Sequence, residues 1–158
     1  MKGFLKFVIV VLILGIIIYC VYQFALPVYA KGWLDYQVTM VVNKDEKAEI
    51  EAVQNVVVPN LSVTYQELFE DFTKYPYWEY TVATTSTNRI ITFNGQDATF
   101  EYTGGANKDV IYNKADLRAV FEIMPDGSIK MDMYLNNELQ SQDQKVEILG
   151  IMSDKMEP

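Results

Sequence analysis

The stretch from Thr64 to Tyr80, TYQELFEDFTKYPYWEY, carries a helix signal followed directly by a strand signal. Thr64 and Glu67 have the spacing of a capping box, in which each side chain accepts a hydrogen bond from the other residue's backbone N–H. We expect the helix to end near Tyr75, because Pro76 disfavours helical geometry in the residue before it. The apolar residues that share one face of this helix are Tyr65, Leu68, Phe69 and Phe72.

Five runs downstream of this helix have the composition and alternation that indicate β-strands. They cover residues 78–82, 89–93, 98–102, 117–123 and 129–135. Asn94-Gly95 and the tetrad Pro125–Ser128 predict turns. Thr103–Asn107 predicts a flexible loop between the third and fourth runs. The last run is the clearest, since its apolar residues stand at every second position.

The flanking segments complete the predicted domain. Leu34–Val42 alternates like a half-buried strand, although a helix close to the linker fits the same residues. Asn43–Ala52 is rich in charged helix formers, and Asp45 could cap a short helix there. Beyond Asn137 the period changes to that of an amphipathic C-terminal helix. Its apolar positions are Val146, Ile148, Leu149, Met152 and Met156.

The order of these elements, helix, antiparallel meander, helix, predicts an α+β fold with two layers. In such a domain the sheet buries one face under helices and leaves the other face in water. Residues 31–158 are enough for one core of this kind and too few for two.

Residues 1–30 are predicted to be a signal-anchor or transmembrane segment. Residues 7–26 form an uncharged run that is long enough to cross a bilayer as a helix. Lys2 and Lys6 precede the run and an acidic domain follows it, so the positive-inside rule places the N-terminus in the cytoplasm and the domain outside. The predicted membrane-spanning residues include Phe7, Leu14, Ile18 and Leu26.

A cleaved signal peptide is the second interpretation of this segment. Pro27 breaks the helix, and small residues precede a cut after Ala30 at the required spacing. Cleavage would release residues 31–158 as a secreted protein. The apolar run is longer than that of most cleaved signals, which favours an uncleaved anchor. Export without structural cysteines is easiest to reconcile with a bacterial cell envelope.

The composition excludes several classes of enzyme. The chain has 158 residues and no histidine, which removes Ser-His-Asp triads, Cys-His pairs and His-ligated zinc or haem. The single cysteine, Cys20, lies in the apolar segment, so neither an intrachain disulfide nor a CxxC motif is available. We therefore expect no cofactor and no metal site.

The charge of the domain narrows the classes of partner. Residues 31–158 carry 11 basic and 21 acidic side chains, a net charge of −10. Such a domain repels the phosphates of nucleic acids and of anionic lipids, so nucleic acid is not an expected partner. An acidic surface suits a cationic protein, and it also keeps the domain soluble.

Four sets of segments between Val63 and Met152 carry a resemblance to known domains: 63–72 with 76–80, 91–95, 119–123 with 126–128, and 134–138. In that order they are similar to the motifs T-x-G-E-A-F with P-x-W-E-Y-F, V-x-F-x-G, Q-F-x-x-x-x-D-G-T/S and L-x-x-N-x-x-P-Q. These motifs belong to a family of small exported or membrane-anchored bacterial domains that have no assigned activity and often follow a zinc ribbon or a transmembrane helix. The resemblance implies a helix, meander, helix domain, and it implies no site residues.

Some residues could carry chemistry or binding. Glu67, Glu70 and Asp71 could pair carboxylates or hold calcium, but no Gly-centred ligand loop accompanies them, which favours a solvated helix face. Gly104–Lys108 lacks the following helix that a phosphate loop needs. Most aromatic residues of this region fit the core by their period. Tyr75 and Tyr77 flank Pro76 and are less constrained by this period, and exposed aromatic residues are enriched where proteins meet partners. The possible partner-binding residues are Tyr75, Tyr77 and Trp78.

Three functions fit these observations. The leading hypothesis is a non-enzymatic, membrane-anchored domain that binds another envelope or secreted protein. The second is an inhibitor or immunity-type protein that blocks a cationic toxin or hydrolase with an acidic surface and a Tyr/Trp patch. The third is a glycosidase-like enzyme that uses carboxylates alone, which needs two acidic side chains facing one cleft.

Overall fold

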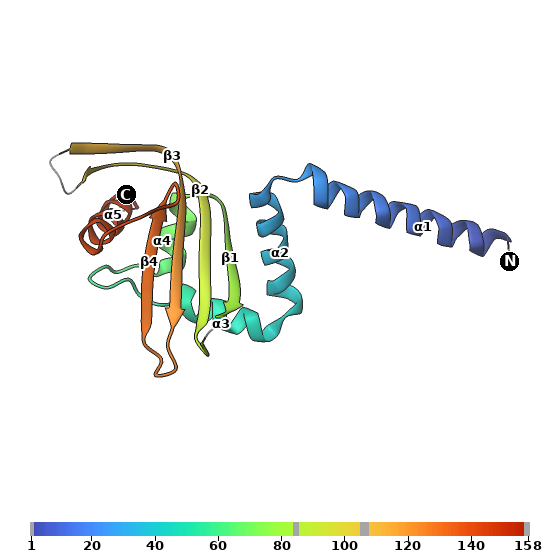
Figure 1. Cartoon of the computed structure of the whole chain (residues 1–158), viewed down its shortest axis with the longest axis horizontal. Coiled ribbons are helices and arrows are strands. Elements are labelled where there is room, and N and C mark those ends of the chain that lie inside the picture. The colour runs from blue at the N-terminus through green and yellow to red at the C-terminus, as the bar shows by residue number, and fades with distance from the viewer. Residues whose placement is uncertain (1, 84–85, 105–107, 157–158) are drawn as a thin grey trace. The chain divides into compact units, whose positions relative to one another are not determined.

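The computed structural model describes residues 2–83, 86–104 and 108–156. The chain divides into two compact units, Met1–Lys31 and Gly32–Pro158. The first unit holds the apolar N-terminal helix, and the second holds the sheet and the helices that cover it. Figure 1 gives the labels of the elements.

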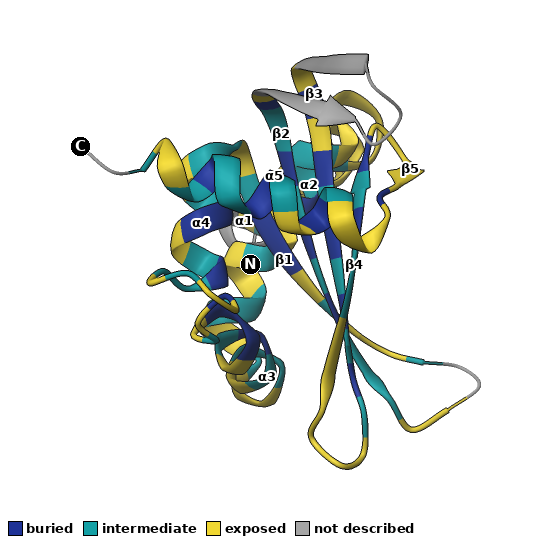
Figure 2. Ribbon diagram, turned by 90° about the vertical axis from the view of Figure 1, so that its left-hand side faces the viewer, coloured by how far each residue is buried: buried dark blue, intermediate teal, exposed yellow. Residues whose placement is uncertain are grey.

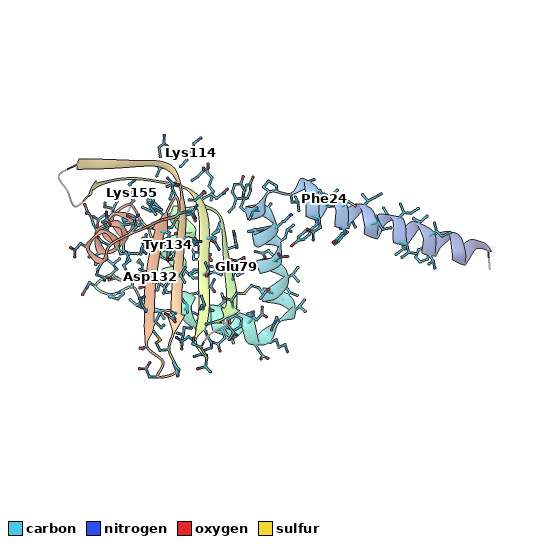
Figure 3. The ribbon with its side chains drawn as sticks, in the orientation of Figure 1. Phe24, Glu79, Lys114, Asp132, Tyr134 and Lys155 are labelled. Atoms are coloured by element: carbon cyan, nitrogen blue, oxygen red, sulfur yellow. The ribbon has the colours of Figure 1, made fainter. Side chains whose placement is uncertain are left out.

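The first unit is built from an apolar helix. Helix α1 covers Lys2–Cys20, and the π-helical turn η1 covers Val21–Ala25. Phe7–Ala25 is long and apolar enough to cross a membrane, and none of it is buried within the structure. The segment therefore fits a membrane anchor or a signal sequence. Leu26, which was predicted to lie in the span, follows η1 and has an extended backbone. Phe24 on η1 is exposed and is labelled in Figure 3.

Helix α2 covers Val28–Val42, so the strand expected over Leu34–Val42 is wrong and the helical alternative holds. The residues of α2 that turn toward the rest of the second unit are spaced by four, as one face of a helix requires: Gly32, Tyr36 and Met40. Val38, which the alternating pattern placed beside them, is exposed. The period of two in this segment is a coincidence of composition.

Helix α3, Lys44–Gln54, follows directly, and Asn43 rather than Asp45 caps it. The Asn43 side chain accepts a hydrogen bond from the Glu46 N–H at 3.3 Å. Asp45 is the second residue of the helix, where its negative charge interacts favourably with the positive end of the helix dipole.

Helix α4, Tyr65–Phe72, confirms the predicted capping box. The Thr64 N–H donates to the Glu67 carboxylate at 2.8 Å, and the Glu67 N–H donates to the Thr64 hydroxyl at 3.2 Å. The helix ends at Phe72 rather than near Tyr75, because Thr73 is already extended and strand β1 begins at Lys74.

The five strands form one antiparallel meander in the order β1-β2-β3-β4-β5, which confirms the predicted α+β class. Figure 1 shows β1 and β4 on opposite sides of the sheet, with α5 (Gln142–Asp154) beside β4. The strand bounds are β1 Lys74–Val82, β2 Arg89–Gly104, β3 Lys108–Ile123, β4 Ile129–Leu135 and β5 Glu138–Leu139.

The turn predicted at Asn94-Gly95 is wrong, because β2 continues through it with irregular register between Gly95 and Phe100. A Cβ atom at Gly95 would overlap the Thr73 side chain, so glycine serves close packing here. The two strands predicted on either side are one long strand. The predicted loop Thr103–Asn107 is also corrected, since Thr103 and Gly104 end β2, and residues 105–107 lie outside the described residues.

The core lies between helices α3, α4 and α5 and one face of the sheet. Phe69 on α4 stacks on Phe93 with ring centroids 4.9 Å apart, and Trp78 meets Phe93 edge-on at 5.0 Å. Figure 2 shows the buried residues, in dark blue, in these helices and along the strands. From α5, Ile148 and Met152 join this core as expected, whereas Val146 is 60% exposed.

One polar network crosses the edge of this core. The indole N–H of Trp78 donates to the Glu70 carboxylate at 2.9 Å. The side-chain amide of Gln54 donates to the same carboxylate oxygen at 3.5 Å and to the Tyr36 hydroxyl at 3.1 Å. The network joins α2, α3, α4 and β1, and it gives the buried indole and amide groups the partners that burial demands.

We predict that Glu70→Ala lowers the free energy of unfolding of the full chain by about 1 to 3 kcal/mol, because it leaves the Trp78 indole N–H buried without an acceptor. Glu70→Gln keeps an oxygen acceptor and is expected to cost clearly less. Urea titrations in detergent micelles, followed by tryptophan fluorescence, measure both variants. Equal losses for the two variants would show that the acceptor at this position does not stabilise the core.

Candidate functional site

The candidate site lies at the β4 side of the sheet, where strand pairing ends early. Strand β5 pairs with Tyr134 and Leu135 of β4, and the Gln140 N–H adds one bond to the Met133 carbonyl at 2.9 Å. The chain then leaves the sheet, because Ser141 caps helix α5. Among the described residues no strand pairs with the outer side of 129–131, which we call the open edge.

The direction of the backbone groups on the open edge follows from the register. In an antiparallel ladder, the N–H and C=O of alternate residues point to the same neighbour. Leu135 pairs with Glu138 of β5 next to the turn at residues 136–137, so its backbone groups point away from β3. The Met133 carbonyl also points away from β3, because it accepts a hydrogen bond from the Gln140 N–H. The N–H and C=O groups of Met131 and Ile129 therefore point away from β3 as well.

A groove runs along the open edge. Its volume is about 560 Å³, within the range of protein ligand sites. We call it the edge groove. It is lined by residues of the loop before α4, of α4, of β4 and of α5: Pro59, Asn60, Leu61, Tyr65, Ile129, Lys130, Met131, Gln142, Lys145, Val146, Leu149 and Gly150.

Helix α5 forms one wall, and its capping box fixes where it starts. The Ser141 N–H donates to the Gln144 side chain at 2.8 Å, and the Gln144 N–H donates to the Ser141 hydroxyl at 3.3 Å. Ile148 and Met152 hold the opposite face of the helix in the core. This orientation leaves Val146 exposed on the groove side.

The loop of residues 59–61 forms the other wall and is held at its base by backbone hydrogen bonds. The Val58 N–H donates to the Val63 carbonyl at 2.9 Å, and the Leu61 N–H donates to the Val58 carbonyl at 3.0 Å. Asn60 takes the left-handed conformation that this tight turn needs, with φ of 66°. The wall is therefore held in place by short-range bonds.

The charged groups of the groove are positive. Lys145 has a side chain only 10% exposed, and its ammonium group donates to the Met131 carbonyl at 2.8 Å. Asp132, labelled in Figure 3, lies 3.7 Å from Lys145 and 3.1 Å from the more exposed Lys130. The hydrogen bond to Asp132 raises the pKa of Lys130, which favours its charged form.

Tyr65 adds a neutral polar group to the groove. Burial raises the pKa of its phenol, which stays protonated at neutral pH. Its ring packs edge-on against Phe121 at 4.8 Å, so the side chain is held by the core. The groove thus combines apolar side chains with two ammonium groups, one hydroxyl and the side-chain amides of Asn60 and Gln142.

The predicted partner-binding residues lie elsewhere and do not form one exposed patch. Trp78 is 1% exposed inside the core, and Tyr77 is 8% exposed with its ring against Gly32 of α2. The exposure expected of Tyr77 is therefore wrong, because α2 covers its ring, and Trp78 is buried in the core cluster. Tyr75 is 55% exposed at a bulge of β1, with φ of 53°, and its role in binding stays a prediction.

Two of the three acidic residues of α4, Glu67 and Glu70, make hydrogen bonds that stabilise the fold. Glu67 caps the helix, and Glu70 accepts the Trp78 indole N–H, so a solvated helix face is wrong for Glu70. In the described part of the chain no group of three or more metal-binding side chains occurs. The edge groove has no carboxylate in its lining, and a neighbouring cavity of about 360 Å³ has Asp154 alone. Neither supplies the acid pair that the glycosidase alternative requires.

The edge groove was not predicted, although one signal for it is present in the sequence. Lys145 stands on the apolar face of the C-terminal helix, at i, i+3, i+4 and i+7 with buried residues Ile148, Leu149 and Met152. A lysine at such a position needs a polar partner nearby. The partner is a backbone carbonyl of the sheet edge, which a periodic pattern does not reveal.

Comparisons of the chain with family models, with curated proteins and with solved structures gave no match. The resemblance over 63–152 therefore stays a prediction.

Proposed function

We propose that this protein is a membrane-tethered, extracytoplasmic domain that binds another envelope or secreted protein and does not itself catalyse a reaction. The observation that carries the proposal is the edge groove, which combines apolar walls with an unpaired sheet edge. Exposed backbone groups beside apolar surface are the elements by which many binding domains hold a segment of another protein.

The apolar helix supports the tether. We propose that residues 7–26 span the bilayer, with Lys2 and Lys6 on the cytoplasmic side and residues 31–158 outside; the length and apolar composition of Phe7–Ala25 support this. Secretion after cleavage following Ala30 is the alternative form of the same proposal. The resemblance to membrane-anchored bacterial domains without assigned activity points to the same location, the bacterial envelope.

Cysteine labelling tests the topology, because Cys20 is the single cysteine of the chain. In a Cys20→Ser background we expect Ser128→Cys, in an exposed turn, to react with a membrane-impermeant maleimide in intact cells. Gly3→Cys is expected to react only after permeabilisation. Intact mass spectrometry should give the full chain rather than residues 31–158. Labelling of Gly3→Cys in intact cells would reverse the topology.

The acidic charge of the domain supports a cationic surface on the partner. It equally supports the inhibitor or immunity alternative, in which the partner is a toxin or hydrolase. That alternative also invoked a Tyr/Trp surface patch, but Tyr77 and Trp78 are buried. The acidic charge of the domain is therefore the observation that still supports the inhibitor alternative. Nucleic acid is not proposed as a partner, for the same electrostatic reason.

Co-purification tests the proposed function. The tagged full chain, extracted in mild detergent from the membranes of its native cells, is expected to retain one protein at a fixed ratio that saturates as the tagged chain is increased. Quantitative mass spectrometry measures the ratio, and a tagged peptide of residues 1–31 is the control.

The same experiment separates the alternatives. A basic partner with hydrolytic or toxic activity, whose release rises steeply with salt, would favour the inhibitor. A partner without such activity would support the leading proposal. Absence of any saturable partner would contradict both.

A further inference from the structure

We propose that the edge groove binds an extended, acidic segment of the partner protein, which adds to the open edge as a further antiparallel or parallel strand beside β4. This inference rests on the proposed function, since it names the kind of segment that the binding domain takes. It is carried by the outward backbone groups of Ile129 and the outward N–H of Met131, with which no strand pairs among the described residues, and by the apolar side chains and lysines of the groove.

The backbone of the open edge offers hydrogen bonds to an added strand. The N–H and C=O of Ile129 and the N–H of Met131 point outward, while the Met131 carbonyl is bonded to Lys145. An extended segment that passes along these groups spans about 3.3 Å per residue, so three to four of its residues pair with the edge. This is the geometry of strand addition.

The opposite edge of the sheet is protected in ways that the open edge is not. On β1, Pro76 offers no N–H, and the register is irregular between Lys74 and Tyr77. Gly32 of α2 also lies against the Tyr77 ring. Proline, irregularity and a covering helix are common means of blocking a sheet edge. The open edge of β4 has a groove in front of it instead.

The walls of the groove select apolar side chains. Val146 on α5 and Ile129 on β4 are 60% and 40% exposed, and Pro59 and Leu61 face them from the loop. Successive side chains of a strand point to opposite faces, so alternate residues of an added segment enter the groove. The segment is therefore expected to have apolar residues at every second position.

Charge complementarity selects an acidic segment. The groove is lined by two lysines and by no carboxylate, although residues 31–158 together carry a net charge of −10. Asp132 lies in ion-pair distance of both lysines, and Glu122 also acts on Lys130. Neither carboxylate lines the groove, so an aspartate or glutamate side chain of the bound segment would pair with the ammonium group of Lys130, whose side chain is 60% exposed. The cationic partner surface proposed above faces the rest of the domain.

Selection from a peptide library tests this inference. The probe is a display library of random decapeptides, panned on the full chain in lipid nanodiscs, with empty nanodiscs for counter-selection. We expect enrichment of peptides with apolar residues at alternate positions and at least one Asp or Glu. An enriched peptide methylated on alternate backbone nitrogens is expected to bind at least tenfold more weakly, because methylation removes the donors of an added strand.

Matched variants locate the binding site. Val146→Glu changes the groove wall and is expected to weaken binding of the enriched peptide at least tenfold. Val82→Glu changes a valine of similar exposure on β1, 56% against 60%, and binding should stay within twofold. Lys130→Glu is expected to weaken it at least fivefold. Lys74→Glu is the control, because Lys74 is also exposed and forms an ion pair of the same length, 3.1 Å, with Asp97. Peptide binding to this control should stay within twofold. Circular dichroism shows that each variant is folded.

Three results would overturn the inference: no enriched sequence, enrichment of basic sequences, or equal binding to the Val146→Glu and Val82→Glu variants. If the co-purified partner is retained by Val146→Glu at an unchanged ratio, the inference fails while the proposed function stands. If the full chain retains no partner at all, both the inference and the proposed function fail.

Discussion

The burial of Trp78 against α4 is the constraint on which the rest of the domain depends. Its ring meets Phe93 and Phe69 in the core, and its N–H must find an acceptor, which Glu70 provides at 2.9 Å. Because Glu70 and Phe69 are neighbours on one short helix, their two contacts together hold α4 in its observed rotation on the sheet. Gln54 extends the network to α3, so the helical layer is fixed by one aromatic cluster and one polar network.

A single helical layer on a meander leaves both sides of the sheet as edges, one formed by β1 and the other by β4 with the two-residue strand β5, and the two edges differ. The β1 edge is interrupted by Pro76 and approached by α2 through Gly32. The β4 edge is paired only near Leu135, because the chain turns into α5 after Gln140. The candidate site is thus a consequence of where β5 ends. Lys145 stabilises this arrangement by bonding the Met131 carbonyl, which an additional strand would otherwise satisfy.

Local patterns in the sequence were enough to predict the α+β class, the capped helix α4, the turn before β4 and the helix α5. They failed where long-range packing decides. Asn94-Gly95 reads as a turn, but Thr73 packs against Gly95 and β2 runs on. Tyr77 reads as exposed, but α2 covers it. The edge groove depends on the side-by-side placement of β4, α5 and the 59–61 loop, which no local period encodes.

Amide hydrogen exchange along β4 tests the central claim, that residues 129–131 present an unpaired edge, most directly. In the full chain without peptide, the N–H groups of Ile129 and Met131 should exchange at least about a hundredfold faster than those of Lys130 and Asp132, which pair with β3. NMR resolves the four amides individually. Equal protection of all four would mean that the edge is already covered, and it would contradict the account.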